Sequence, residues 1–206
     1  NVSIEAGAAM QLIAAAGTEL TVNATGLLTI SSGAELIINQ SSVHSGTSIT
    51  NTVFEAGAIL RTATATLPTA SGYSEIDVYI QGVAGSLTLD ASWSQLTATT
   101  DLIVNCPNMS NGLLSFAGNI TALASLLIED TDGTTGGRVL LGAATTTLNI
   151  GSGGITVQGD SRVFVSNGAA TVTVNTSGDF NFNPDASALF SQFATTGTGA
   201  NNMNDG

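Results

Sequence analysis

The chain has 206 residues, 43% of them hydrophobic, which is enough for the core of one domain or of two small ones. Only 9% of the residues are charged, lysine is absent, and fifteen carboxylates against three arginines give a net charge of −12. This balance argues against nucleic acids and anionic membranes as partners, because both require a positively charged surface. No apolar run is long enough to predict membrane insertion.

Short apolar pairs recur through residues 1–40, each with one residue between its two members. Within a pair, a spacing of two places both side chains on one face of a strand. One strand of this length buries little by itself, so the pattern predicts a β-solenoid in which each coil stacks on the last. Successive pairs begin 8, 10, 8 and 8 residues apart, at Val2/Ile4, Met10/Leu12, Leu20/Val22, Leu28/Ile30 and Leu36/Ile38.

An internal echo supports this repeat: the segment Ile4–Met10 returns, with similar residues, as Phe54–Leu60. The shared order is apolar, Glu, Ala, Gly, Ala and apolar, which predicts a strand end, a corner and a new strand. A helix over residues 6–20 is the competing prediction, because Ala, Met, Gln and Leu form helices readily. Gly7 and Gly17 disfavour that helix.

The regular period weakens in the middle of the chain. Residues 41–50 form a Ser/Thr-rich corner or loop with the single histidine, His44, and within residues 61–100 only Ile76, Val78 and Ile80 alternate clearly. We therefore predict a first solenoid block over 1–60, an irregular break or insertion with strands over 61–100, a second block over 101–190, and a Gly/Asn-rich tail or linker over 191–206. The chain begins within the pattern, so we expect it to be a piece of a longer protein.

The second block carries apolar pairs at longer and more variable steps. Asparagines often follow its strands, and at equivalent corners of successive coils their side chains are expected to stack into a ladder. These asparagines are Asn105, Asn175 and Asn183, with Asn23 and Asn39 in the first block. The pairs are Leu102/Val104, Leu114/Phe116, Leu126/Ile128, Val139/Leu141, Leu148/Ile150, Ile155/Val157, Val163/Val165, Val172/Val174 and Phe180/Phe182.

Short strands with a period near eight favour an all-β, right-handed parallel β-helix, since crossover connections between parallel strands are right-handed. A β-sandwich is the alternative, because it also has many short strands separated by turns. Sandwich strands are usually longer, however, and the Cys…Trp…Cys pattern of immunoglobulin domains is missing here.

Runs of alternating apolar and small polar residues recur in the segments 26–34, 102–107, 114–120, 147–157, 161–168 and 171–175. These segments resemble the repetitive β-helical segments of very large surface adhesins and filament proteins from Bacteroidetes-type bacteria. The resemblance implies a β-solenoid, export by the type IX secretion route, and a role in adhesion, gliding or prey capture.

Candidate sites for chemistry are few. Asp130 and Asp132 lie in the densest acidic stretch, Glu129–Gly133, and an Asp-x-Asp-Gly sequence resembles the start of a calcium loop. An acidic solvated corner is the competing interpretation, because the remaining ligands of an EF-hand are absent. Cys106, the only cysteine, is predicted to be a buried thiol, and Arg162 with Asp160 a surface ion pair.

These observations predict a non-catalytic structural or adhesive segment of a large extracellular surface protein or filament, without a cofactor. The expected partners are identical chains in a homo-oligomer or bundle, and surface glycans or other cells. A polysaccharide-binding or polysaccharide-degrading β-helix is one alternative. A chain without lysine, however, offers few cationic side chains that could act as a catalytic base. An ice-binding solenoid is another, suggested by the Thr-x-Thr rows at residues 62–66 and 171–173.

Overall fold

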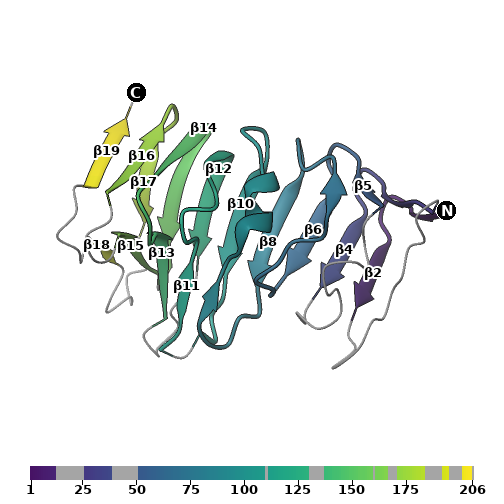
Figure 1. Cartoon of the computed structure of the whole chain (residues 1–206), viewed down its shortest axis with the longest axis horizontal. Coiled ribbons are helices and arrows are strands. Elements are labelled where there is room, and N and C mark those ends of the chain that lie inside the picture. Colours follow the sequence, from purple (N-terminus) through teal and green to yellow (C-terminus); the bar gives the residue numbers. More distant parts are fainter. Residues whose placement is uncertain are drawn as a thin grey trace.

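A computed structural model of the chain describes residues 1–12, 26–38, 51–109, 111–129, 137–159, 161–166, 171–183, 192–194 and 201–205. In this part of the chain, every strand pairing is parallel, and the strands form three sheets stacked into a solenoid (Figure 1). The all-β solenoid is therefore confirmed. The sandwich alternative is wrong, because its sheets are built from antiparallel strands.

The largest sheet, here called sheet B, runs along the whole solenoid. Figure 1 shows its strands side by side from the N-terminal to the C-terminal end. Strand β17 (Phe180–Asn183) lies off this path and pairs with β14 alone among the described strands. Sheet B takes, in order along the axis, β2 (Ala9–Leu12), β4 (Glu35–Ile38), β6 (Ile59–Thr62), β8 (Asp77–Gln81), β10 (Asp101–Asn105), β12 (Ala122–Glu129), β14 (Thr146–Gln158), β16 (Val172–Thr176) and β19 (Asn201–Asp205).

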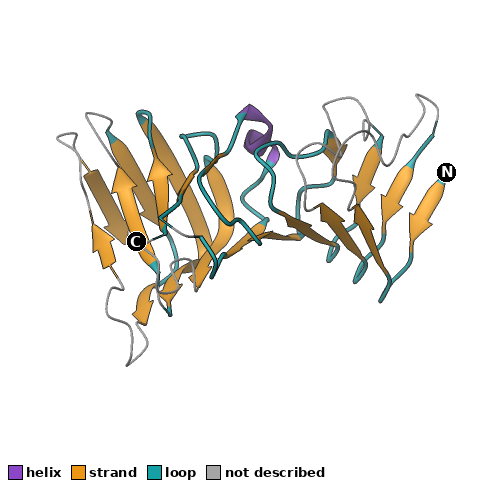
Figure 2. Ribbon diagram, turned by 90° about the horizontal axis from the view of Figure 1, so that it is seen from below, coloured by secondary structure: helices purple, strands orange, loops and turns teal. Residues whose placement is uncertain are grey.

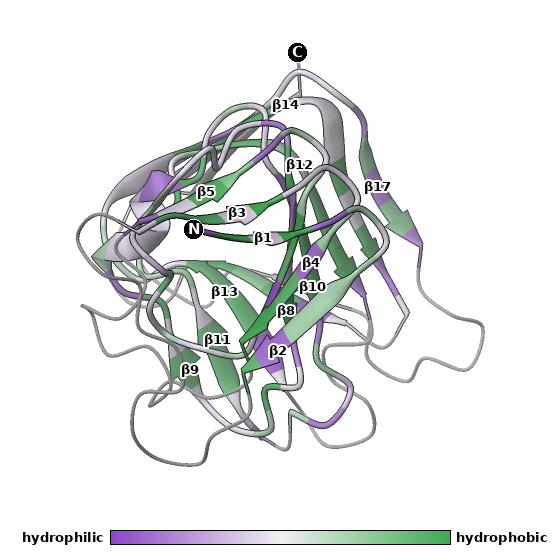
Figure 3. Cartoon of the chain, turned by 90° about the vertical axis from the view of Figure 1, so that its right-hand side faces the viewer, coloured by the Kyte–Doolittle hydropathy of each residue, from purple (hydrophilic) through white to green (hydrophobic). Residues whose placement is uncertain are grey.

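Two shorter sheets complete the coils, and the view along the axis in Figure 3 shows the three sheets around the interior. Sheet A belongs to the N-terminal part and sheet C to the C-terminal part. Sheet A consists of β1 (Val2–Ile4), β3 (Leu28–Ile30), β5 (Thr52–Phe54) and β7 (Ala70–Ser71). Sheet C consists of β9 (Leu87–Thr88), β11 (Leu113–Ser115), β13 (Arg138–Gly142), β15 (Arg162–Ser166) and β18 (Gln192–Ala194).

The length of each coil can be read from the strand register of sheet B. Glu35 pairs with Ile59, and Asp77 pairs with Asp101, so these coils contain 24 residues. The predicted step of about eight residues is therefore one third of a coil. The coil between Ile59 and its partner Asp77 is shorter, with 18 residues. Coil length thus varies while the pairing of sheet B continues.

The echo between residues 4–10 and 54–60 is explained by stacking. Ile4 and Phe54 are the two partners of Ile30 in sheet A, on either side of its strand. In the same way, Met10 and Leu60 flank Leu36 in sheet B. The two segments therefore occupy the same place in coils that lie two positions apart along the axis.

The corner between sheets A and B requires a left-handed backbone. Gly7, Gly33 and Gly57 have φ angles of 77°, 71° and 80°, which glycine adopts without steric cost. The corners also bond to each other, since the amide of Gly7 donates to the carbonyl of Gly33 (2.9 Å) and that of Gly33 to Gly57 (2.8 Å). Glu75 occupies the next corner with a φ of 58°.

The core lies between the sheets and takes the inward member of each alternating strand. Leu28, Leu36, Leu102 and Leu126 are at most 1% exposed, as the period-two pattern predicts. The pattern fails at Val2, which is 54% exposed on β1, and at the Phe180/Phe182 pair, where Phe180 is half-buried and Phe182 is 38% exposed on β17. The competing helix over residues 6–20 is wrong at residues 9–12, which form β2.

Residues 61–100 contain short strands and one 3-10 helix, η1 (Ala91–Gln95), which Figure 2 shows midway along the solenoid. Strand β8 pairs in register with both β6 and β10, so sheet B passes through this region. Trp93 of η1 is fully buried and donates from Nε1 to the carbonyl of Ala65 at 2.9 Å. The predicted division of the chain into blocks remains a prediction.

Among the described residues, no helix is both long and apolar enough to cross a membrane.

Candidate binding face on sheet B

The outward side chains of sheet B form rows along the solenoid axis. On β8, for example, Val78 and Ile80 point into the core, whereas Asp77, Tyr79 and Gln81 are half-buried on the outer face. Neighbouring strands pair in register about 4.8 Å apart, so equivalent outward residues lie one strand spacing from each other. The sheet therefore presents an ordered, repeating surface.

Three such rows cross the middle of the sheet, and all their members are half-buried. The first is partly acidic, the second mostly apolar, and the third rich in amides. The first row contains Glu35, Ile59, Asp77, Asp101 and Ser125. The second contains Ile37, Arg61, Tyr79, Ile103, Leu127 and Thr156, and the third Gln81, Asn105, Glu129 and Gln158.

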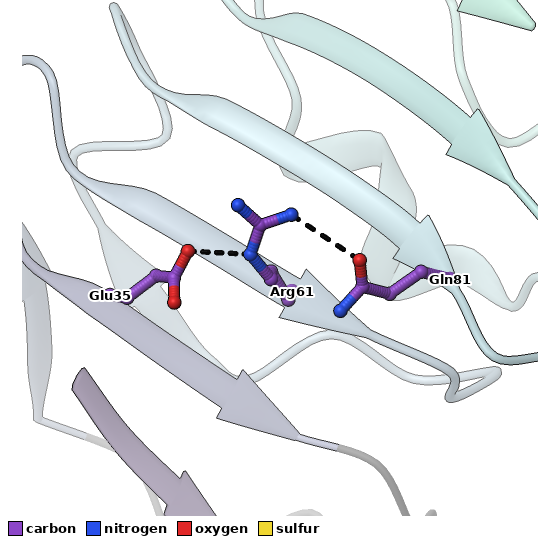
Figure 4. Close-up of polar contacts among 3 residues, drawn as sticks. All are labelled: Glu35, Arg61 and Gln81. Atoms are coloured by element: carbon purple, nitrogen blue, oxygen red, sulfur yellow. Dashed lines mark hydrogen bonds and ion pairs between the residues drawn. The ribbon is translucent and has the colours of Figure 1, made fainter.

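Arg61 connects the three rows at the N-terminal end of this surface. Its Nε donates to Oε1 of Glu35 at 2.5 Å, and one terminal nitrogen donates to Oε1 of Gln81 at 3.3 Å (Figure 4). Its guanidinium carbon also lies 4.0 Å from the centre of the Tyr79 ring, which is a cation–π contact. The face therefore already binds one guanidinium, through a carboxylate, an amide and an aromatic ring.

Asp77 and Asp101 are stacked on adjacent strands, where their carboxylates repel each other. The pKa of Asp77 is raised, mainly by burial and further by the charge of Asp101, while Arg61 acts in the opposite direction. The hydroxyl of Ser125 donates to Oδ1 of Asp101. This pair is the part of the face where a positively charged partner would be most favourable.

The amide row is linked by side-chain hydrogen bonds between coils. Asn105 donates to Oε1 of Glu129 at 3.2 Å, and Gln158 donates to Oε2 of the same residue at 2.9 Å. A second ladder joins Asn175 to Asn149 at 2.8 Å. The predicted ladder of strand-end asparagines is therefore not formed as such, because Asn105 bonds to Glu129, and Asn149, the partner of Asn175, lies within β14 and not at its end.

The acidic pair expected to bind calcium, Asp130 and Asp132, lies outside the described residues, as do His44 and Asp160. The calcium site and the Arg162–Asp160 ion pair therefore stay predictions. Within the described ranges, no group of three or more His, Cys, Asp or Glu side chains is placed to hold a metal ion. Glu129, at the start of the acidic stretch, belongs to the amide row.

The other singled-out residues are mostly structural. Cys106 is fully buried as predicted; burial raises the pKa of its thiol to about 11, and a hydrogen bond from the Val83 backbone partly offsets this. Tyr73 is buried and donates to the carbonyl of Pro68 at 2.8 Å. Trp93 is also buried, whereas Tyr79 faces outward on sheet B.

The sequence pattern alone does not indicate that Asp77, Asp101 and Arg61 share a surface. Two sequence features point toward the Asp77–Asp101 pair. The two aspartates are 24 residues apart, and each directly precedes a strand of alternating apolar residues. Neither signal determines which coils become neighbours until the length of each coil is known.

No family model, no curated protein and no solved structure matches this chain.

Proposed function

We propose that this chain is a non-catalytic, structural and adhesive segment of a large extracellular surface protein or filament. The observation that supports the proposal most directly is the continuous parallel pairing of sheet B from β2 to β19. Pulling along the axis loads many interstrand hydrogen bonds and the core behind them, so the coils act as a stiff rod. Such a rod can separate or hold two surfaces and also present a long contact face.

The acidic, lysine-free composition supports an extracellular, cell-surface location. The resemblance to surface proteins of Bacteroidetes-type bacteria adds export by the type IX route, and adhesion, gliding or capture of prey as the task. The proposed partners are other cells, their surface glycans, and identical chains. Half-buried apolar residues between polar rows on sheet B are suited to contacts of this kind.

Adhesion is tested with beads that carry the 206-residue chain and are washed over bacterial cells and immobilised glycans. We expect beads with the wild-type chain to be retained, and fewer beads to be retained when they carry the double variant Tyr79→Ser with Ile103→Ser on sheet B. The matched control is Thr29→Ser with Val53→Ser on the outer face of sheet A, where pairing is also in register. Equal retention of both variants and the wild type would contradict an adhesive role for sheet B.

The absence of catalysis is tested separately, with a panel of acidic and neutral polysaccharides. We expect no new reducing or unsaturated ends after incubation with the chain. Turnover that disappears in Asp77→Asn, Asp101→Asn, Asp130→Asn or Asp132→Asn would instead support the polysaccharide-degrading alternative.

The positions of two of the threonines argue against the ice-binding alternative. Thr62 and Thr64 are fully buried and share a hydrogen bond of 2.7 Å between their hydroxyls, so they do not form an outward array.

A further inference from the structure

The apolar row of sheet B stays partly accessible over three neighbouring coils. Tyr79 on β8, Ile103 on β10 and Leu127 on β12 pair in register, and each is half-buried on the outer face. The residues directly before and after each of them are buried in the core, so the sheet fixes the row in place. Covering such a row with a partner removes apolar area from water, which is favourable. The row is therefore a candidate contact line, roughly 10 Å long across its two strand spacings.

The polar rows on the two sides of this line differ in how their charges are compensated. In the amide row, Glu129 accepts an amide hydrogen bond from a neighbouring coil at each of its carboxylate oxygens. In the first row, Asp77 and Asp101 lie in register on adjacent strands, where their charges repel each other. The hydroxyl of Ser125 donates to Asp101 but carries no charge to offset it. A cationic group of a partner therefore gains most beside the two aspartates.

Arg61 shows how this face holds a cation. The residue belongs to the apolar row itself, on the strand next to that of Tyr79. Its Nε donates to Glu35 of the first row (Figure 4), and its guanidinium carbon lies 4.0 Å from the centre of the Tyr79 ring. On β10 a carboxylate and an apolar side chain recur at the equivalent positions, as Asp101 and Ile103. There, no arginine of the row stands between them, so a partner can supply the guanidinium.

We propose that the outer face of sheet B, from β8 to β12, binds a cationic amphipathic helix of another protein. The apolar stripe of that helix would lie on the row Tyr79, Ile103 and Leu127. Arginines along one side of the stripe would lie beside Asp77 and Asp101. The inference rests on the proposed function, because it names the class of partner that the adhesive face takes.

The spacing of the row favours a helix over an extended strand. Row members lie about 4.8 Å apart, whereas side chains on one face of an extended strand are about 6.7 Å apart. One turn of a helix rises about 5.4 Å. From Tyr79 to Leu127, a helix therefore departs from the row by about 1 Å and a strand by about 4 Å. A helix that lies along the solenoid axis can contact all three members of the row.

The composition of the chain argues against a second copy as the occupant of this face. The chain has no lysine, three arginines and a net charge of −12, so two copies repel each other. A polymer of amino sugars would supply positive charge, but sugar rings pack on aromatic rings and not on side chains such as Ile103 and Leu127. An apolar centre with an aromatic residue, bordered by polar and charged groups, is typical of protein interfaces.

The test uses the 206-residue chain and a synthetic helical peptide of about four turns, with a leucine stripe bordered on one side by arginines. Isothermal titration calorimetry at low salt should show binding that weakens as salt screens the charges. Asp77→Asn with Asp101→Asn should weaken binding by at least about tenfold, and so should Ile103→Thr with Leu127→Thr. Threonine favours strands, and circular dichroism confirms that each variant keeps its β spectrum.

Matched controls separate the face from net charge. Glu5→Gln with Glu55→Gln also removes two negative charges, from exposed corners before β2 and β6, and should leave binding unchanged. On the side of the peptide, citrulline in place of arginine removes the charge, and a scrambled order removes the stripe. Both changes should weaken binding by at least about tenfold, independently of how any chain variant folds. Binding that follows net charge alone, and neither the face nor the stripe, would overturn the proposal.

A competing ligand separates a protein partner from a glycan. Glucosamine oligomers carry ammonium groups but no apolar stripe, so we expect them to bind far more weakly than the peptide. Oligomers that bind as tightly as the peptide, and lose binding in the double aspartate variant, would overturn the proposal in favour of a glycan. A wild-type chain that does not bind the peptide would overturn it as well. Beads still retained on cells in that case would leave the adhesive function standing, so the two failures are distinguishable.

Discussion

Threonines illustrate how single residues are tolerated inside the solenoid. Thr62 and Thr64 are buried, but their hydroxyls bond to each other, and that of Thr64 also donates to the carbonyl of Thr66 at 2.8 Å. Thr52 is 2% exposed, and its hydroxyl is buried without a hydrogen-bond partner. A buried polar group without a partner lowers stability, so Thr52 is a place where the fold can be improved.

We predict that Thr52→Val raises the free energy of unfolding by about 1 kcal/mol, since valine has nearly the same shape and no unsatisfied hydroxyl. Urea unfolding followed by circular dichroism measures the change. Thr62→Val is the control and should destabilise the chain by a similar amount, because it leaves the hydroxyl of Thr64 with fewer partners. A loss of stability in Thr52→Val would show that its hydroxyl has a partner in solution.

The pKa of Asp77 leads to a prediction about pH. Because burial, and then Asp101, raise its pKa in the folded state, the folded chain favours protonated Asp77. The corresponding stability is present below the pKa of an unfolded aspartate and is lost as pH rises through the folded pKa. Asp77→Asn should therefore match the wild type in acid and exceed it at neutral pH.

The measurement is the urea midpoint of wild type and Asp77→Asn as a function of pH. Asp179→Asn, which removes one negative charge at an exposed position, is the control for the change in net charge. A constant difference between Asp77→Asn and the wild type across the acidic range would contradict the raised pKa.

At the scale of elements, the corners determine how strands of sheets A and B are joined. A corner with positive φ turns the chain within a few residues and keeps the next strand in line with the coil below. At Gly33 there is space for a Cβ, whose nearest neighbour would be the Cβ of Ala6 at 4.0 Å. At Gly72 a Cβ would overlap the carbonyl oxygen of Phe54. The two positions separate backbone strain from steric overlap.

We predict that Gly33→Ala costs about 1 kcal/mol, because alanine is strained at positive φ and only partly compensated by a less flexible unfolded chain. Gly72→Ala should cost clearly more, since the overlapping atom belongs to the backbone and the coil must shift. Both values come from urea unfolding. Glu75→Gly is the reverse change, at a φ of 58°, and should not destabilise the chain. Equal costs at Gly33 and Gly72 would refute this account of the corners.

At the scale of the whole molecule, stability depends on a core shared by successive coils. Leu148 of β14 is 1% exposed and pairs with Val174 of the next coil. Its neighbour Thr147 is exposed on the outer face of the same strand. Because each coil contacts only its neighbours, a charge inside one coil removes support from the coils on both sides.

We therefore expect Leu148→Asp to abolish cooperative folding or to lower the melting temperature severely, as it buries a charge without a partner. Thr147→Asp adds the same charge one residue away and should melt close to the wild type. Thermal unfolding followed by circular dichroism distinguishes the two. A Leu148→Asp chain with wild-type melting would contradict the inward orientation of this residue.

Local pattern was sufficient to predict much of the fold from the sequence. Inward pairs such as Leu28/Ile30 and Leu102/Val104 are buried as predicted, because alternation along a strand depends only on neighbouring residues. Corner glycines such as Gly7 and Gly57 were also identifiable, because the need for positive φ is local. The pattern failed at Phe182, where burial depends on whether another strand covers β17.

Only the tertiary structure determined which outward residues share a surface. Arg61 meets Glu35 and Gln81, which lie 26 and 20 residues away, and Asp77 meets Asp101 after 24. The two-residue period specifies which face of its strand a side chain occupies. It does not specify which strand lies beside that side chain. That neighbour depends on the number of residues in each coil, which changes between 18 and 24 where sheet B crosses β6, β8 and β10. Interstrand hydrogen bonds set the register only after the corners have closed each coil, so the faces of sheets B and C arise from the stacked molecule.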